Sequence, residues 1–389
     1  TNIRRDLSVE NKGSANVNDM NVEKEVADLL RRYPHPQNNQ GHFLFANSTL
    51  TARNVARENS KQYYVEMAVL IDPGIWDLYS SLHIYPNAME METIVTRKIR
   101  ETYSHIINGV NVLYNKIHDI SMEISVTLRQ FYIFQREFPH IKSLVRIVDG
   151  KKTINAKKYL HDITRWDTAL GSRNGTDYDH AMLFTRYDLY QISTRNNYIT
   201  GLSYRGEVCN IGSRTSVVEA HDFFLTTSTA AHELGHNLGA FHDGEESATS
   251  CRAEDLFVMS PIVPRFDRTM RYSRNPWLFS NCSVEAFKKT LPTKACLANK
   301  GIFFDEQEWK EYVKKLPGEV YSTTEQCELI NGPKSKYCGA VPRHICRFMQ
   351  CTDPNTDECL MNYYNAARGT SCGVDMWCME GRCMTKLMK

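Results

Sequence analysis

The stretch TAAHELGHNLGAFHDG, residues 229–244, sets three histidines and a glutamate in a tight register. Residues four apart lie on one face of a helix, so His232 and His236 are placed to hold one metal ion. Glu233 is rotated off that line and cannot easily join them as a ligand. It can instead reach a water molecule on the metal, which is the position of a general base.

The second half of the stretch adds a third ligand. Gly239 is expected to end the helix, because glycine accepts the left-handed backbone of a helix C-terminus. The chain then turns back and brings His242 to the metal. Three nitrogen ligands leave the fourth position of a tetrahedral zinc open, which is typical of catalytic rather than structural zinc. His221 and Asp222, which precede the helix, are interpreted as polar loop residues.

A methionine lies downstream in LFVMSP, residues 256–261. A methionine before a turn is often plain core packing. After HExxHxxGxxHD, however, Met259 resembles the methionine turn that lies beneath the zinc ligands in the metzincin clan of proteases. The pair His242 and Asp243 resembles the reprolysin (adamalysin) family of that clan, which includes the ADAM and ADAMTS proteases.

Composition narrows the function class. The chain has 389 residues, enough for more than one domain, and a net charge of +2 from 47 basic and 45 acidic residues. This balance argues against nucleic acid as a partner and against a polybasic membrane contact. No apolar run approaches the length of a transmembrane helix, so no membrane anchor is expected.

Twelve cysteines all lie at or after Cys209, and eight of them fall within residues 327–383. This density is typical of a disulfide-stapled extracellular module. A zinc ribbon is the alternative, but the spacings lack a repeated CxxC pair. Asn47 and Asn174 begin glycosylation sequons, which also fits secretion. Asn281 fits the same pattern, although Cys282 is expected in a bridge.

Periodicity predicts an α/β domain. Residues 1–60 are polar and are interpreted as a flexible lead segment or the remnant of a pro-region, with a processing site or a solvated charge pair at Arg31–Arg32. From residue 63, strands and helices alternate, which predicts a mixed sheet. Strands are expected at 63–71, 121–134, 180–186 and 201–209, and helices at 99–117, 155–166 and 283–291, the last one capped by Ser283.

Residues 61–300 resemble a reprolysin-type zinc protease, a mixed twisted sheet with a long zinc-binding helix. The resemblance implies the bridges Cys209–Cys296 and Cys251–Cys282. It also implies a calcium site far from the zinc, and its ligands would be Glu66, Asp179, Asn299 and the carbonyl of Cys296.

Residues 301–322 are expected to be a linker with a short helix, and 323–389 resemble the disintegrin-like module of ADAMTS proteases. Sequence alone leaves 105 pairings of eight cysteines open. The order of the cysteines in that family implies Cys327–Cys351, Cys338–Cys359, Cys346–Cys378 and Cys372–Cys383. No Arg-Gly-Asp tripeptide occurs. One protease domain with one such module resembles the salivary metalloproteases of blood-feeding arthropods.

We therefore predict a monomeric, secreted zinc endopeptidase that acts on extracellular proteins; the resemblance implies matrix or clotting proteins such as fibrinogen. The segment Gly201–Tyr204 is expected as an edge strand that pairs with the substrate. Residues Pro261 to Pro264 would line the primed-side pocket. The alternative is a catalytically silent scaffold that binds a protein through its cysteine-rich module.

Overall fold

In a computed structural model, the structure describes residues 7–9, 60–117, 119, 121–136, 139–148, 150–174, 178–191, 199–263, 274–301, 306–339 and 344–386. The expectations for Asn47, Arg31–Arg32 and Pro264 lie outside these residues. Asn174 is the last residue of a helix, but its side chain lies outside the described part.

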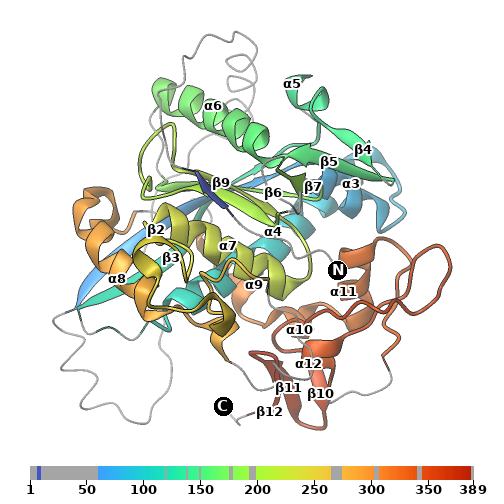
Figure 1. The fold of residues 1–389 in the computed structure, drawn as a ribbon. Coiled ribbons are helices and arrows are strands. Elements are labelled where there is room, and N and C mark those ends of the chain that lie inside the picture. The colour runs from blue at the N-terminus through green and yellow to red at the C-terminus, as the bar shows by residue number, and fades with distance from the viewer. Residues whose placement is uncertain are drawn as a thin grey trace.

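A six-stranded mixed sheet forms the centre of the molecule (Figure 1). Its order is β1-β8-β9-β6-β2-β3, and every neighbouring pair is parallel except β8 and β9. The strands are β1 (Leu7–Val9), β2 (Lys61–Ile71), β3 (Met122–Ile133), β6 (His180–Thr185), β8 (Gly201–Tyr204) and β9 (Thr215–Glu219).

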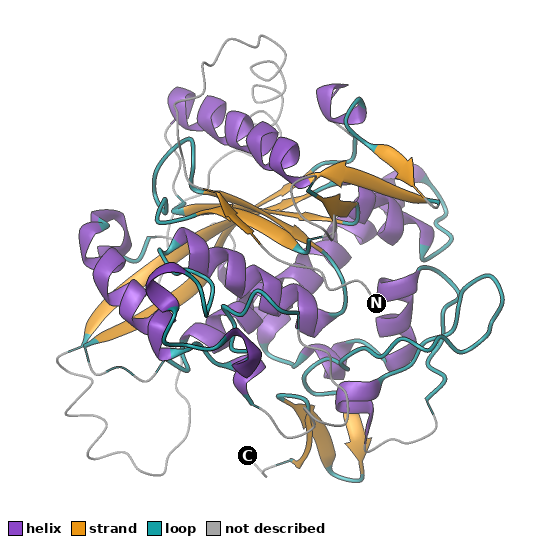
Figure 2. Cartoon of the chain, viewed as in Figure 1, coloured by secondary structure: helices purple, strands orange, loops and turns teal. Residues whose placement is uncertain are grey.

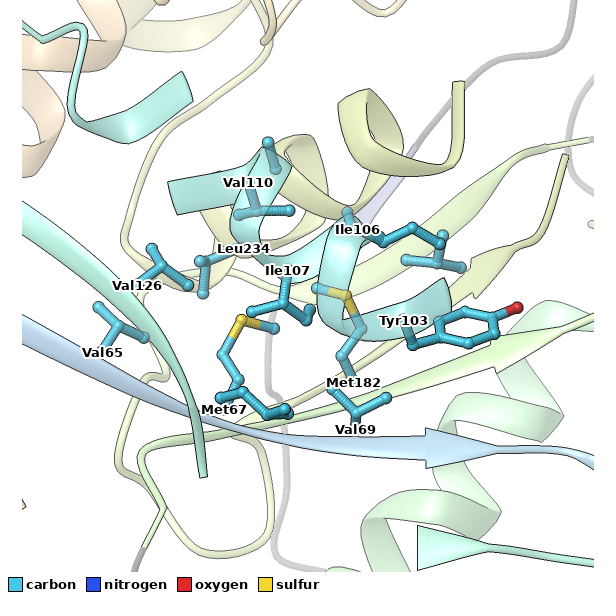
Figure 3. Packing of buried hydrophobic residues seen from close by; sticks show 14 of the residues in the cluster. Val65, Met67, Val69, Tyr103, Ile106, Ile107, Val110, Val126, Met182 and Leu234 are labelled. Atoms are coloured by element: carbon cyan, nitrogen blue, oxygen red, sulfur yellow. The ribbon is translucent and has the colours of Figure 1, made fainter. Parts of the chain in front are cut away.

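Helices cover both faces of the sheet. The long helix α4 (Ala88–Tyr114) and helix α7 (Phe223–Asn237) lie on one face, and α6 (Ala156–Asn174) lies on the other (Figure 1). Strand β2 is buried on both sides, so its residues divide between two cores. Val65, Met67 and Val69 pack against α4 and α7 (Figure 3), whereas Ala68 and Leu70 pack against α6.

Smaller elements complete this part of the chain. Helix α3 (Pro73–Ser81) follows β2, and a second sheet has the order β4-β5-β7. The remaining elements are α5 (Pro139–Lys142), β4 (Arg146–Val148), β5 (Lys151–Asn155), β7 (Asp188–Tyr190), the 3₁₀ turns η1 (Glu246–Ala248), η2 (Ala253–Asp255), η3 (Asn275–Trp277), η4 (Leu291–Thr293) and η5 (Ala295–Ala298), and α8 (Asn281–Thr290).

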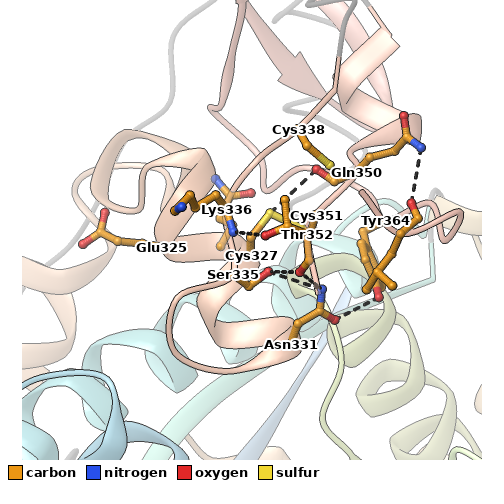
Figure 4. The surroundings of a disulfide bond; sticks show 12 residues. Glu325, Cys327, Asn331, Ser335, Lys336, Cys338, Gln350, Cys351, Thr352 and Tyr364 are labelled. Carbon is orange, nitrogen blue, oxygen red and sulfur yellow. Dashed lines mark hydrogen bonds between the residues drawn. A yellow bond between two sulfur atoms is a disulfide. The ribbon is translucent and has the colours of Figure 1, made fainter. Parts of the chain in front are cut away.

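The C-terminal module, residues 317–386, consists mostly of loops (Figure 2). Its apolar cluster consists largely of half-cystines, joined by Ile345, Met349 and Ala366. Around Cys327–Cys351, Ser335 Oγ donates to the carbonyl of Thr352 at 2.6 Å (Figure 4). The module contains α10 (Pro317–Val320), α11 (Thr323–Asn331), α12 (Ile345–Phe348), β10 (Ser371–Gly373), β11 (Met376–Met379) and β12 (Arg382–Thr385).

The segment expected as a linker carries helix α9 (Glu306–Val313), which packs on α4. Arg100 of α4 pairs with Glu308, and Trp309 packs against the main core. Residues 306–313 are therefore part of the folded body.

The α/β fold class is confirmed, with three local corrections. Ser280, not Ser283, caps α8, since Ser280 Oγ accepts from the N–H of Ser283 at 3.2 Å. Strand β9, which was not predicted, follows β8 and precedes α7 along the chain. Strand β8 is not the edge strand, because β1 pairs with it through Leu7 opposite Leu202. The exposed backbone groups of β8 are thus used by the chain's own N-terminal segment. In the described residues, no helix is long and apolar enough to cross a membrane.

Candidate metal centre

The three histidines of the opening stretch converge at one point. His232 and His236 lie on α7, and His242 comes from the loop after it. The Nε2 atom of His236 is 3.0 Å from Nε2 of His232 and 3.1 Å from Nε2 of His242. All three side chains are buried, with at most 3% of their surface exposed. Among the described residues they form a cluster whose ligand atoms can share one ion.

The opposite ring nitrogens settle which atoms face the centre. Nδ1 of His232 donates to the carbonyl of Val258 at 2.6 Å, and Nδ1 of His236 donates to the carbonyl of Ala240 at 2.8 Å. Nδ1 of His242 lies 3.0 Å from a carboxylate oxygen of Glu245. A neutral imidazole that donates from Nδ1 keeps a lone pair on Nε2, so the Nε2 atoms are the ones that can bind a metal.

Three lone pairs that converge in a buried space repel one another unless a cation lies between them. Burial, followed by the charges of His242 and His232, lowers the pKa of His236 well below its usual value, so the ring is neutral. Two nitrogens that bind a tetrahedral zinc at about 2.0–2.1 Å lie about 3.3 Å apart. The observed spacing and the chemistry of the donors therefore fit a zinc ion.

Local sequence explains why α7 has these ends. Asp222 caps the helix, since its carboxylate accepts from the N–H groups of Phe224 and Leu225 at 2.8 and 2.9 Å. Asp222 was interpreted as a loop residue, and its Asx position before a helix was the missed signal. At the other end, Gly239 has φ +105°. This left-handed conformation, which glycine adopts without strain, turns the chain toward His242.

Glu233 lies on α7 beside the histidines and is fully buried. Its carboxylate lies against the backbone of Gly201 at the start of β8: a Cβ atom added there would be 2.5 Å from Oε1 of Glu233. Any larger residue at position 201 would push the carboxylate away. Sequence reasoning named Gly201 as the start of a strand but not as the neighbour of Glu233, because the two residues meet only in the tertiary structure.

Met259, the residue expected in a methionine turn, is buried and packs against α7 at Gly235. A Cβ added at Gly235 of α7 would be 2.5 Å from the sulfur of Met259, so the helix and the turn pack closely only because position 235 is glycine. The turn is tied to the ligand loop, since the N–H of Asp243 donates to the carbonyl of Met259 at 2.9 Å. Ser280 Oγ donates to the buried carboxylate of Asp243 at 2.6 Å.

A buried hydrogen-bond network fixes the end of α7. The side-chain amide of Asn237 donates to the carbonyls of Tyr204 and Ser213 at 2.9 and 3.2 Å. Its oxygen must then accept from Nδ1 of His180, 2.9 Å away on β6, while Nε2 of His180 accepts from Ser216 at 2.8 Å. Asn237 directly follows His236, so this network positions the ligand. It was not predicted, because its members are distant in sequence.

Two of the expected calcium ligands, Glu66 and Asp179, lie next to each other, and the carboxylate of Asp179 lies near the sulfur of Cys296. Glu66 and Asp179 exchange hydrogen bonds: the N–H of Glu66 donates to Oδ2 of Asp179 at 2.9 Å. Burial, and to a smaller degree the neighbouring Glu66 carboxylate, raise the pKa of Asp179 to about 7. Turn η5, which contains Cys296 and precedes the exposed Asn299, contacts β2.

The structure contains six disulfides, and they are the pairs that the resemblance implies. Cys209–Cys296 ties η5 to the segment before β9, and Cys251–Cys282 ties the loop after His242 to α8. No described cysteine is free. Disulfides in this number are typical of proteins in oxidising compartments.

Known sequences place this site in a family. Residues 61–273 match the sequence model of metallo-peptidase family M12, described as Reprolysin_5. The chain belongs to metallo-peptidase family M12. Membership implies that the metal is zinc. Residues 317–384 match ADAMTS cysteine-rich domain 2, so we call this part the cysteine-rich module.

Curated relatives of this M12 chain carry the name "A disintegrin and metalloproteinase with thrombospondin motifs". Number 18 from Mus musculus is 32% identical over 242 residues, which are 59% of this chain and 18% of that protein. Number 18 from Homo sapiens is 31% identical over 297 residues, 72% of this chain and 22% of that protein. Number 16 from Mus musculus is 28% identical over 308 residues, which are 76% of this chain and 23% of that protein. The chain thus spans about a fifth of the length of these relatives.

Proposed function

We propose that the chain is a zinc-dependent endopeptidase that acts on extracellular proteins, matrix or clotting proteins among them. The observation that carries the proposal is the convergence of three Nε2 lone pairs beside the buried carboxylate of Glu233. A zinc ion held there by His232, His236 and His242 supplies a Lewis acid that polarises a peptide carbonyl and acidifies water.

The protein's own groups perform the proton transfers. Glu233 takes a proton from the attacking water and later delivers it to the leaving amine. Gly201 leaves the space that the Glu233 carboxylate occupies, since a Cβ at position 201 would be 2.5 Å from its Oε1. The Nδ1 hydrogen bonds to Val258 and Ala240 keep His232 and His236 oriented with their Nε2 atoms inward.

The substrate would extend along β8, with Pro261 and the residues after it forming one wall of the primed-side pocket. Strand β1 pairs with residues 202–204, so β1 and a substrate strand cannot occupy this edge together. Release of β1 is therefore the first requirement for a substrate that pairs there.

Two further proposals concern the environment of the enzyme. Glu66, Asp179, Asn299 and the carbonyl of Cys296 hold a calcium ion, whose charge would offset the two adjacent carboxylates. Six disulfides suit secretion, with Asn174 as a glycosylation acceptor.

The decisive experiment compares Glu233→Ala with Glu358→Ala on a quenched fluorogenic peptide. Glu358 is exposed in the cysteine-rich module and serves as the matched control. Glu233→Ala should keep stoichiometric zinc, measured by atomic absorption, and lose at least about 10²-fold in kcat/KM. The control should match the unmodified protein, and a chelator should abolish its activity. A chain that binds zinc but hydrolyses nothing would instead support the binding-scaffold alternative.

A further inference from the structure

The three histidines of the metal centre differ in what holds the ring nitrogen that faces away from it. In His232 and His236 this nitrogen, Nδ1, donates to a backbone carbonyl, at 2.6 and 2.8 Å. In His242 it lies 3.0 Å from Oε2 of Glu245. A backbone carbonyl is present whatever residue occupies the position, whereas a carboxylate is not. The orientation of the His242 ring therefore depends on a further side chain.

His242 is also the ligand that a helix does not position. His232 and His236 lie on α7, which ends at Asn237, so the helical backbone sets the direction of both side chains. His242 follows in a segment that is neither helix nor strand. Its Nε2 must nevertheless point at Nε2 of His236, 3.1 Å away. A hydrogen bond at Nδ1, on the opposite side of the ring, restrains the rotation that would turn Nε2 away.

The carboxylate of Glu245 also selects the tautomer of His242. A carboxylate only accepts hydrogen bonds, so Nδ1 carries the proton and Nε2 keeps the lone pair that a metal needs. A bond to a charged acceptor is stronger than one to a backbone carbonyl. Donation to a carboxylate also makes the imidazole a more basic metal ligand. Glu245 therefore favours both the orientation and the protonation state in which His242 binds a metal.

The backbone places Glu245 beside the ring before any metal is bound. Its N–H donates to the carbonyl of His242 at 3.1 Å, and its carbonyl accepts from the N–H of Ala248 at 2.8 Å. The disulfide Cys251–Cys282 joins the same loop to α8. The carboxylate thus extends from a fixed backbone, although 57% of the side-chain surface is exposed.

The two neighbouring carboxylates have other surroundings. Asp243 accepts from Ser280 Oγ at 2.6 Å, and Ser280 caps α8, so Asp243 anchors the loop to that helix. Glu246 is exposed on η1, and its carboxylate is not the one that His242 contacts. Glu246 consequently carries the same charge in the same loop and offers a matched control.

We propose that Glu245 is a positioning residue of the metal centre, whose carboxylate holds the His242 ring with Nε2 toward the zinc ion. The inference rests on the zinc site of the proposed function but not on hydrolysis. Hydrogen-bond partners of metal-bound histidines typically contribute about 10- to 100-fold in metal affinity. Water competes for the exposed carboxylate, so we expect about tenfold.

The test measures the zinc Kd of the full chain by competition with a chromophoric chelator. Glu245→Ala should raise the Kd about tenfold. Glu246→Ala removes the same charge without touching the ring and should change the Kd by less than about twofold. Glu245→Gln loses the charge but keeps an oxygen that accepts from Nδ1, so its Kd should lie between those of Glu245→Ala and the unmodified chain.

Cobalt(II) in place of zinc gives a second readout, which reports ligand geometry rather than stability of the fold. The visible absorption bands of the cobalt-loaded chain should shift in Glu245→Ala and stay in place in Glu246→Ala, with circular dichroism confirming that both variants are folded. An unchanged zinc Kd in Glu245→Ala, an equal rise in Glu246→Ala, or a rise in Glu245→Gln as large as in Glu245→Ala would overturn the proposal. If the Kd values follow the expected order but no peptide is hydrolysed, Glu245 keeps this role and only the proposed function fails.

Discussion

The catalytic part and the cysteine-rich module reach a fixed shape by different means. The catalytic part buries two large apolar clusters on the two faces of its sheet and has two disulfides. The module has four disulfides and a cluster made largely of the half-cystines themselves. Dense packing can hold the Nε2 atoms of His232 and His242 at 3.0 and 3.1 Å from that of His236. Disulfide cross-links suffice in the module, where the loops need only a stable frame.

Two disulfides allow a matched test of this contrast. Cys251–Cys282 in the catalytic part and Cys346–Cys378 in the module have sequence separations of 31 and 32. Loop-closure entropy assigns each about 4 kcal/mol. Loss of either disulfide should therefore lower the free energy of unfolding by a similar amount. Only the module lacks an apolar core large enough to remain folded after that loss.

We therefore expect the largest effect from the double substitution Cys346→Ala with Cys378→Ala. The module should lose its fold and become sensitive to protease, as seen by limited proteolysis with mass spectrometry. Cys251→Ala with Cys282→Ala should lower the Tm but leave the catalytic part folded. The contrast between the regions breaks down if both double variants resist protease equally.

The second prediction concerns the seam where the catalytic part and the cysteine-rich module meet, and where the ring of His105 on α4 lies 6.3 Å from the ring of Tyr321 in the module. The pKa of His105 is lowered from 6.5 to about 4 because the ring is buried. Between these two pH values the unfolded chain binds more protons than the folded one, so stability falls as the pH drops from 6.5 toward 4. This ring accounts for about 3 kcal/mol of that loss.

His105→Leu should remove this part of the acid sensitivity. Urea unfolding at pH 7 and at pH 4.5 should show a smaller difference in the variant than in the unmodified chain. His161→Leu, at an exposed position, is the control and should change nothing. An unchanged pH difference in His105→Leu would mean that water reaches the ring in the seam.

The third prediction compares a calcium ion with a disulfide as a cross-link. The proposed calcium site would join two distant segments of the catalytic part without a further disulfide. With zinc kept saturated, calcium at 100 times its Kd should stabilise the chain by about 2.7 kcal/mol. Asp179→Ala should abolish this shift in Tm, whereas Asp77→Ala, at an exposed carboxylate, should keep it. A Tm that ignores calcium at constant zinc would show that the ends are held by Cys209–Cys296 and packing alone.

The smallest effect is expected at the ion pairs across the seam, which Glu380 of the module forms with Lys116 at 2.6 Å and with Arg274 at 2.5 Å. Burial raises the pKa of Glu380, but Lys116 and Arg274 outweigh it, and the net pKa is lowered. The stabilisation is thus present above the unfolded pKa and is lost as the pH falls through the lower, folded value. Glu380→Gln should cost about 1 kcal/mol at pH 7, less at high salt because the site is partly exposed. A larger loss of stability that does not depend on salt would mean that the seam excludes water as fully as the two apolar clusters of the catalytic part do.

Much of the metal site followed from local sequence. The four-residue spacing of His232 and His236 puts both rings on one face of any helix, and Gly239 permits the turn that brings in His242. Strands β2, β3 and β6 and helices α4 and α6 were predicted because their apolar periodicity is strong. The cysteines were identified as bridges, but their pairing rested on resemblance.

Local pattern alone determined which residues can bind a metal, because ligand type and helical spacing are properties of neighbouring positions. Only the tertiary structure decided what surrounds them. Gly201 lies against Glu233 because β8 packs on α7, and Asn237 at the end of α7 meets His180 at the start of β6. Strand order and the seam arise when segments distant in sequence bury their apolar surfaces together, and the spacing of residues along the chain carries no record of that choice.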